Sequence, residues 1–375
     1  MNAKRITALA LALVMTLLLA ACGSKTVVND DGTKTEQTER GVKVTQTAAK
    51  AVQTEKYETA DFSMTIPKGW TVTTGGTNIY HSIRVYDPAE PLNQMFVLLK
   101  ADVLLHSQAG KEAWQQNYSM GNTQAALFTK AAVLDNPSTE GFFKIFSQYT
   151  AFASEVEPAY SGYAFPRFDN FTVTDRYPSA SPLKSSALGD EQLRATFTDN
   201  GKEGEGLFAA SVVDFGSFAI SNGNVVGYQL QAVDGGYYMA YNIVAVTAAK
   251  DAFIEWEGVL TDCFKTLQYS DSFVSATNQA SNEKVALAQQ ISQNFNATMD
   301  GFMSSWESRN RSQDIMSQKQ SDTTLGYERV YDTETGEIYK ATNGFTDVYD
   351  GKRYKAVTDD NMYAEPISGY IEKQS

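Results

Sequence analysis

The sequence predicts an α+β protein in which an antiparallel sheet is flanked by helices, followed by a long amphipathic helix and a small tyrosine-rich β module. Three observations predict this class. Runs of alternating apolar and polar residues, such as "FSMTIPKGW" at 62–70, are typical of half-buried strands. Asn-Gly and Asp-Gly pairs accompany such runs and tolerate the positive φ angles of tight hairpins. Other segments repeat apolar residues at every third or fourth position, which is the spacing of one helix face.

Composition argues against several classes of function. Hydrophobic residues make up 42% and aromatic residues 12% of the 375 residues, which is enough for a sizeable core. The net charge of −13 argues against a nucleic-acid partner, whose binding needs a basic patch. With two cysteines and only two histidines, His81 and His106, we expect no disulfide framework, no multi-histidine metal site and no cofactor.

The N-terminus has the pattern of a secretory signal. "MNAKR" is positively charged, and "ITALALALVMTLLLAA" is apolar but shorter than the roughly 18 to 20 residues of a comfortable spanning helix. Leu19-Ala20-Ala21-Cys22 then resembles the bacterial lipobox. That resemblance implies a lipoprotein signal peptide over 1–21, removed before a lipid-bearing Cys22. The alternative is an ordinary signal peptide with an incidental cysteine.

The predicted location follows from the lipobox resemblance. A lipid on Cys22 would hold the chain at the cell membrane, on the extracytoplasmic face, with the membrane as its partner. Residues 22–55 follow as the lipidated cysteine and a polar stretch without aromatic residues. Such a composition predicts a flexible linker, because it buries too little apolar area to offset its ordering entropy.

Residues 56–275 are expected to form the α+β domain. "FSMTIPKGW", "YHSIRVYD" and "MFVLLKADVLL" predict strands, whereas 108–120 and 138–154 predict helices. Three later strand pairs are expected to turn at Asn200-Gly201, Asn222-Gly223 and Asp234-Gly235.

The domain is expected to close with a helix over 247–267. Its apolar face is spaced at three and four residues and consists of Phe253, Trp256, Leu260, Cys263 and Leu267. We therefore interpret Cys263 as a small buried apolar group.

Two motifs at the ends of this segment carry a family resemblance. "FSMTIPKGW" near its start and "TLQYSDSF" after its last helix resemble the PsbP-like fold, over roughly 57–273. The resemblance implies an antiparallel sheet flanked by helices and a binding or assembly role. It supplies no common catalytic residues, and fold analogy alone does not determine function.

Two further segments complete the chain. A long helix is predicted over 276–320 by an apolar stripe that consists of Ala288, Ile291, Phe295, Met299, Phe302 and Trp306. We expect this stripe to pack on the preceding domain or on a partner protein. In 321–375 the turn signals "DTETGE", Asn343-Gly344 and Asp350-Gly351 predict a small β-hairpin module with seven tyrosines. Together they resemble the C-terminal ends of uncharacterised lipoproteins from Gram-positive bacteria. The tyrosines either cover the helix or form an exposed aromatic platform.

Catalytic signals are weak. Ser181 and Lys184 match S-x-x-K, but they lie in a proline-containing loop, and the companion motifs are absent. Gly75-Gly76 lacks the lysine and threonine of a phosphate-binding loop. Asp359 and Asp360 are adjacent in the sequence, but adjacency does not indicate two carboxylates that face each other across a cleft. His81 and His106 lie on strand-like segments and are expected to be structural. We therefore assign no catalytic residue.

The sequence thus favours a non-enzymatic protein. We expect a membrane-anchored extracytoplasmic lipoprotein that acts as a binding or scaffold module for an envelope protein or glycan. The alternative is a hydrolase that acts on cell-envelope material through a serine or a carboxylate pair. Two carboxylates about 5 to 9 Å apart in a cleft, or Ser181 hydrogen-bonded to a lysine, would favour the hydrolase.

Overall fold

The computed structural model describes residues 25–374, except 29–33, 38–42, 49–51, 179–182, 184–185, 227–228, 281–321, 324, 360–361, 364 and 366. The chain divides into two compact units. The larger unit is Val52–Arg309, and the smaller unit combines Met1–Ala51 with Asn310–Ser375. Both units contain mainly antiparallel sheets together with helices. The structure therefore confirms the α+β class.

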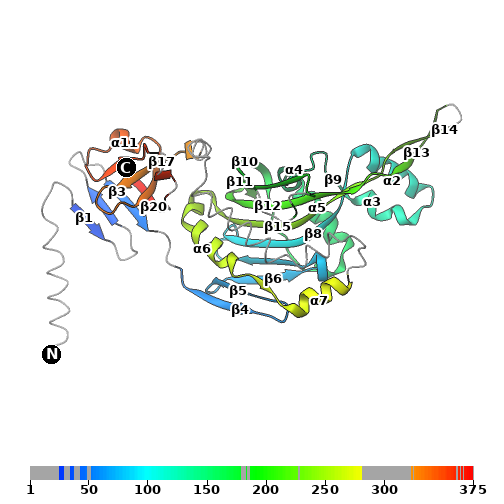
Figure 1. Cartoon of the computed structure of the whole chain (residues 1–375), viewed down its shortest axis with the longest axis horizontal. Helices are drawn as coiled ribbons and strands as arrows, with labels where there is room; N and C mark the ends of the chain where they lie inside the picture. Colours follow the sequence, from blue (N-terminus) through cyan, green and yellow to red (C-terminus); the bar gives the residue numbers. More distant parts are fainter. Residues whose placement is uncertain are drawn as a thin grey trace. The chain divides into compact units, whose positions relative to one another are not determined.

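The larger unit is organised around one long antiparallel sheet (Figure 1). Its strands follow in the spatial order β10 (Asp169–Pro178), β11 (Gly189–Asp199), β12 (Lys202–Gly216), β15 (Tyr237–Ala249), β8 (Gln94–Leu105), β7 (Ser82–Tyr86) and β6 (Thr71–Gly75). The two-residue β9 (Ala132–Val133) pairs in parallel with the end of β8. The central β8 is almost entirely apolar because both of its faces are covered.

The two faces of β8 enter two different cores. Phe96, Leu98 and Ala101 pack with α4 (Thr139–Lys144) and α5 (Phe146–Val156), which contribute the fully buried Phe142, Phe143 and Phe146.

Met95, Val97 and Leu99 point to the opposite face. There they pack with α6 (Phe253–Lys265) and a second sheet. The second sheet has the order β16 (Gln268–Tyr269), β5 (Phe62–Pro67) and β4 (Thr54–Glu58).

The predicted helices are present with altered ends. Segment 108–120 is α2 (Gln108–Ser119), and 138–154 is divided at Ile145 into α4 and α5. The helix expected over 247–267 begins only at Phe253, because β15 continues to Ala249 and a 3-10 turn follows. The first residues of that segment remain in the sheet because they pair with β12.

Only one of the three predicted hairpins in this domain is confirmed. Asn200 and Gly201 join β11 to β12 with φ angles of 50° and 82°, as a tight hairpin turn requires. Asn222 and Gly223 instead lie inside β13 (Ala219–Val226), where the register is interrupted.

Asp234-Gly235 ends β14 (Gln229–Asp234), but this strand pairs with β13 and not with β15. Each of the three dipeptides marks either a positive φ angle or the end of a strand. They carry no information about which strand is the partner.

The smaller unit contains a seven-stranded sheet. Its spatial order is β1 (Lys25–Val28), β2 (Lys34–Gln37), β3 (Lys43–Ala48), β20 (Ile367–Gln374), β18 (Ile338–Thr342), β17 (Tyr327–Asp332) and β19 (Tyr354–Ala356). β20 lies parallel to β18 and antiparallel to β3.

Over 22–55, where the sequence predicted a flexible linker, the described residues lie mostly in strands. Strands β1 to β3 lie within this range, and β4 begins at Thr54. Composition misses this arrangement because β3 gains its hydrogen bonds from β20, near the other end of the chain. The "DTETGE" turn between β17 and β18 is confirmed.

Other expectations for the C-terminal part differ or lie outside the description. Asp350-Gly351 precedes β19. Because β19 pairs with β17 and not with β18, the strand before it in the sequence, this dipeptide does not form a hairpin turn. Asn343-Gly344 leads from β18 into α11 (Phe345–Val348). Most of the helix expected over 276–320 lies outside the described residues; α7 (Asp271–Ala280) covers only its beginning.

The tyrosines of the smaller unit do not form the exposed platform that the sequence left open. Tyr339, Tyr354 and Tyr363 are buried. The other four of the seven are half-buried, and rings such as those of Tyr349 and Phe345 stack 5.1 Å apart. The three buried tyrosines belong to the two small hydrophobic clusters of this unit.

Candidate functional site at the base of the β13–β14 arm

The β13–β14 hairpin, residues 219–234, projects from the larger unit and is called the arm below (Figure 1). Helix α2 lies against its proximal end. Asn117 donates a hydrogen bond to the carbonyl oxygen of Ser221 at 2.7 Å, and the indole of Trp114 donates to the carbonyl oxygen of Gly235 at 3.0 Å. A Cβ atom on Gly110 would lie 2.5 Å from the carbonyl oxygen of Asp234, so the close approach of α2 requires glycine.

A histidine joins the two ends of the arm to the sheet. His106 follows β8, and its Nδ1 lies 2.7 Å from Oδ2 of Asp234 while its Nε2 lies 3.1 Å from Oδ1 of Asp214. Ser217 donates a hydrogen bond to the same Asp234 oxygen at 3.0 Å. We call these four residues the His106 clasp. Its imidazole is 8% exposed and rests on the ring of Tyr238, with centroids 4.0 Å apart.

The clasp changes the acidity of one carboxyl group. Partial burial acts to raise the pKa of Asp234, but hydrogen bonds from His106, the Gly236 amide and Ser217 outweigh it. The pKa of Asp234 therefore lies below its ordinary value.

The clasp is not arranged for nucleophilic catalysis. Both nitrogens of His106 face carboxylates, and Ser217 contacts Asp234 and not the imidazole. A serine nucleophile needs a free ring nitrogen as its base. The contacts of His106 thus join two segments of the fold, as expected of a structural histidine.

Five aromatic rings form a continuous row at the base of the arm. We call them the aromatic row: Phe215, Tyr237, Phe128, Trp114 and Phe218. Phe215 stacks on Tyr237 with centroids 4.7 Å apart and planes 11° apart, and Phe128 stacks on Trp114 at 4.1 Å and 12°. Phe128 lies 6.0 Å from Tyr237, and Phe218 lies 6.0 Å from Trp114, which connects the pairs.

The aromatic row is partly open to solvent. Phe215 is 47% exposed and Phe218 is 40% exposed, whereas the three rings between them are half-buried. Of the ten large hydrophobic side chains exposed in the described residues, seven belong to the arm, to its base, or to the region of α2 and α3 (Ala126–Lys130): Tyr118, Met120, Leu127, Phe215, Phe218, Val225 and Leu230. Such a concentration marks an interaction site more often than scattered exposed residues do.

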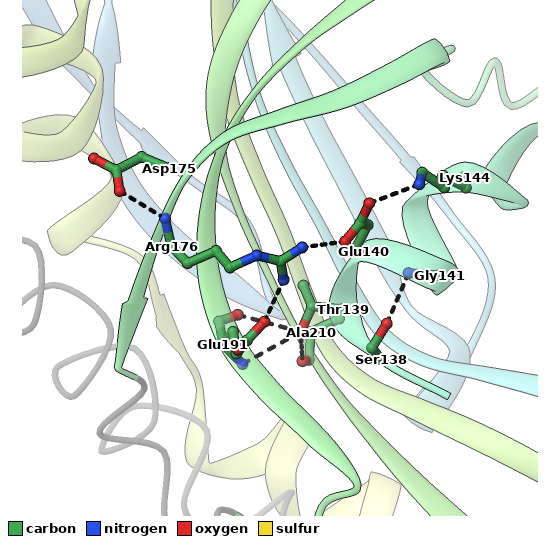
Figure 2. A network of polar contacts seen from close by, with 9 residues as sticks. All are labelled: Ser138, Thr139, Glu140, Gly141, Lys144, Asp175, Arg176, Glu191 and Ala210. Carbon is green, nitrogen blue, oxygen red and sulfur yellow. Dashed lines mark hydrogen bonds and ion pairs between the residues drawn. The ribbon is translucent and has the colours of Figure 1, made fainter. Parts of the chain in front are cut away.

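A second polar cluster serves the fold. Figure 2 shows Arg176 of β10 between Glu140 of α4 and Glu191 of β11. Lys144 contacts the same Glu140 at 2.6 Å, and the hydrogen bonds of these two cations hold the pKa of Glu140 below its ordinary value. Thr139 donates a hydrogen bond to the carbonyl oxygen of Ala210 at 2.8 Å. These contacts fix the start of α4 on the sheet, and the charged groups satisfy one another.

A third cluster is buried beside β8. The ammonium of Lys100 lies 3.0 Å from Asp102, and the hydroxyl of Tyr80 donates to the same carboxylate at 3.0 Å. Burial and the neighbouring negative charge raise the pKa of Tyr80. Burial likewise raises the pKa of Tyr241, whose ring faces Lys100. The phenols therefore remain neutral, and the carboxylate already has its cation.

The remaining candidates from the sequence are dispersed. His81 is buried against Tyr269, with Nδ1 3.2 Å from the phenol oxygen, and burial lowers its pKa to about 4. Cys263 is buried on α6, as predicted, and burial raises the pKa of its thiol to about 11. Asp359 is exposed.

Several residues lie where nothing is described, so their roles remain predictions. Cys22, Ser181, Lys184 and Asp360 all lie outside the described residues. Within the described residues, no group of three histidine, cysteine or acidic side chains is placed to hold a metal ion. In the same part of the chain, no helix combines the length and apolar character needed to cross a bilayer.

The aromatic row was not found from the sequence. Its members come from α2, α3, the end of β12, the loop that follows and the start of β15. The cluster "DFGSF" before an uncharged strand was the available signal. In comparisons with known proteins, no protein family matches the chain, and no curated protein was found to match it.

Proposed function

We propose that this chain is a membrane-anchored extracytoplasmic lipoprotein that acts as a binding or scaffold module for an envelope protein or glycan. The aromatic row is its binding surface. The observation that carries the proposal is the exposure of Phe215 and Phe218 at the ends of a row whose other rings are fixed by stacking. Rigid aromatic side chains bury a large area at a small entropic cost, which makes them effective binding anchors.

We further propose that the larger unit has the PsbP-like fold. Its antiparallel sheet has helices packed on both faces, as that resemblance implies. The two motifs behind the resemblance are also neighbours in space. Ser63 and Phe62 of the first motif pair with Gln268 and Tyr269 of the second, through β5 and β16.

The anchor is proposed from the lipobox resemblance at Leu19-Ala20-Ala21-Cys22. Each buried methylene of an acyl chain stabilises membrane association by about 0.8 kcal/mol, so two chains can retain an acidic protein on a membrane. Cys22→Ala should abolish labelling by a radioactive or clickable fatty acid and release the protein from the membrane fraction. Continued labelling and attachment in this variant would contradict the anchor.

The binding surface is tested by crosslinking in cells. Cells that express the wild-type chain, the double variant Phe215→Ser/Phe218→Ser, or the control Val156→Ser are treated with a membrane-impermeant crosslinker. Val156 is a suitable control because it is exposed and lies on α5, away from the row in sequence and contacts. Crosslinked proteins are quantified by mass spectrometry, and binding to purified cell-wall glycan is measured by co-sedimentation.

The expected outcome is specific to the row. One protein or glycan should be recovered with the wild-type chain and with Val156→Ser, and recovery should fall at least about tenfold with the double variant. Equal recovery in all three would overturn the assignment of the surface. At the clasp, Ser217 contacts a carboxylate and both ring nitrogens of His106 face carboxylates, so this serine has no base beside it.

A further inference from the structure

The distal half of the arm has no cover within the larger unit. Val225 of β13 and Leu230 of β14 lie directly opposite each other and are 60% and 65% exposed. Four consecutive residues of β14, 229–232, are exposed. Because successive side chains of a strand point to opposite faces, both faces of this part of the hairpin are open. The contacts of α2 through Ser221 and Gly235 support only the proximal end.

The outer edge of β14 is also open. Among the described residues β14 pairs only with β13, in a two-stranded sheet of its own. A two-stranded hairpin without cover is marginally stable in water. A free edge presents backbone N–H and C=O groups that accept a further strand. The distal arm therefore has both the apolar side chains and the backbone groups of an incomplete sheet.

The arm is an uncharged part of an acidic chain, and this bears on which strand pairs with the free edge of β14. No charged residue occurs in 215–233, although 20% of the chain is charged and the net charge is −13. Edge strands are commonly protected from self-pairing by lysine or other charges, and this edge lacks them. Two copies of so acidic a chain repel each other, and the neutral projecting arm is where they meet at least electrostatic cost.

We propose that the arm is a self-association element, in which β14 pairs antiparallel with β14 of a second copy. The product is a four-stranded sheet with a two-fold axis, in which the Leu230 side chains of the two copies lie on the same face of the two adjacent β14 strands. This inference does not depend on the aromatic row or its ligand. A six-residue strand buries less than the roughly 1,200 Å² of a stable interface, so the pairing is transient in dilute solution. It is favoured where copies are concentrated on one surface.

Disulfide trapping tests the pairing in the full chain. Gln229→Cys and Gln231→Cys place a single new thiol on β14, and Lys68→Cys places one on an exposed turn as control. The native Cys263 is buried. Two differently tagged copies are expressed together, membranes are treated with a mild oxidant, and the mixed dimer is measured on a non-reducing gel. At least one β14 position should give about fivefold more dimer than Lys68→Cys, because paired strands hold the thiols together.

A second substitution identifies the contact. Adding Leu230→Asp to the trapping variant should lower the dimer yield by about tenfold, since it places an unpaired charge in the shared apolar face. Adding Val156→Asp, at another exposed apolar residue, should leave the yield unchanged. Equal trapping at β14 and Lys68, or the same loss with Leu230→Asp and Val156→Asp, would overturn the proposal. Loss of partner crosslinking in the Phe215/Phe218 variant has no bearing on this outcome.

Discussion

The Nδ1 atom of His106 lies 2.7 Å from Oδ2 of Asp234, at the point where the arm returns to the central sheet. Through its other nitrogen the same imidazole contacts Asp214 near the end of β12. One side chain therefore joins the strand that enters the arm to the strand that leaves it.

Removing that imidazole should loosen the arm more than the domain. In His106→Ala, Asp214 and Asp234 lose the imidazole that bridges them but keep their other donors, and we expect a loss of about 1 kcal/mol in the free energy of unfolding. Hydrogen exchange measured by mass spectrometry should accelerate in 219–234 and remain unchanged in α6. Ser217→Ala, which leaves both imidazole contacts in place, should have a smaller effect. Unaltered exchange in the arm of His106→Ala would contradict the role of the clasp.

Asp234 should contribute to acid sensitivity. Its pKa is lowered in the folded chain, so its contribution to stability is present above its ordinary pKa of 3.8 and is lost as the pH falls through the lower folded value. Asp234→Asn should therefore lose stability at neutral pH and show a flatter decline below pH 4. Urea unfolding of both proteins over that range measures the difference, and parallel curves would contradict it.

His81 predicts a second pH dependence at higher pH. Burial lowers its pKa to about 4, whereas the unfolded chain titrates near 6.5. The unfolded state thus binds the proton more readily, so stability is complete above pH 6.5 and declines as the pH falls toward 4. The decline should approach about 3 kcal/mol.

A phenylalanine at position 81 is the matched control for this dependence. The His81 ring packs between aromatic neighbours, with centroids 5.1 Å from Phe273 and 6.1 Å from Phe62. His81→Phe retains this packing and does not titrate, so its unfolding free energy should be nearly constant from pH 6.5 to 4.5. An unchanged slope in the variant would assign the pH dependence to other groups.

The two cysteines predict a thiol count. Cys263 is buried and burial raises its thiol pKa to about 11, so Ellman's reagent should react with it at least about a hundredfold more slowly in the folded than in the unfolded protein. After unfolding, the membrane form should show one reactive thiol, because the lipid proposed on Cys22 would block the other. Two thiols would contradict lipidation, and Cys263→Ala should show none.

Buried and exposed ion pairs should differ in energy. Arg194 contacts Glu205 with side chains that are 5% and 2% exposed, whereas the side chains of Arg176 and Glu191 are 46% and 44% exposed. Glu205→Gln leaves a buried guanidinium poorly compensated and should cost about 3 to 5 kcal/mol. Glu191→Gln should cost no more than about 1 kcal/mol. Chemical denaturation of the two variants compares them directly, and similar losses would show that burial does not decide the energy.

Much of the local structure follows from the sequence. The apolar run of β8, the stripe of α6 with Cys263, and the Asn200-Gly201 turn are each set by residues within a few positions of one another. Periodicity reports which side chains share a face, and a positive φ angle limits the residue at a turn. These features, and the α+β class built from them, need no knowledge of distant contacts.

Pairing and the candidate site were decided by tertiary structure. The register that places Ala48 opposite Gly369 turned a polar segment into part of a sheet. The aromatic row unites Trp114 and Phe128 with Phe215 and Tyr237 from strands about a hundred positions later. Sequence patterns specify which surface an element must bury, but long-range backbone pairing and packing choose its partner. A site assembled from several elements therefore exists only in the folded chain.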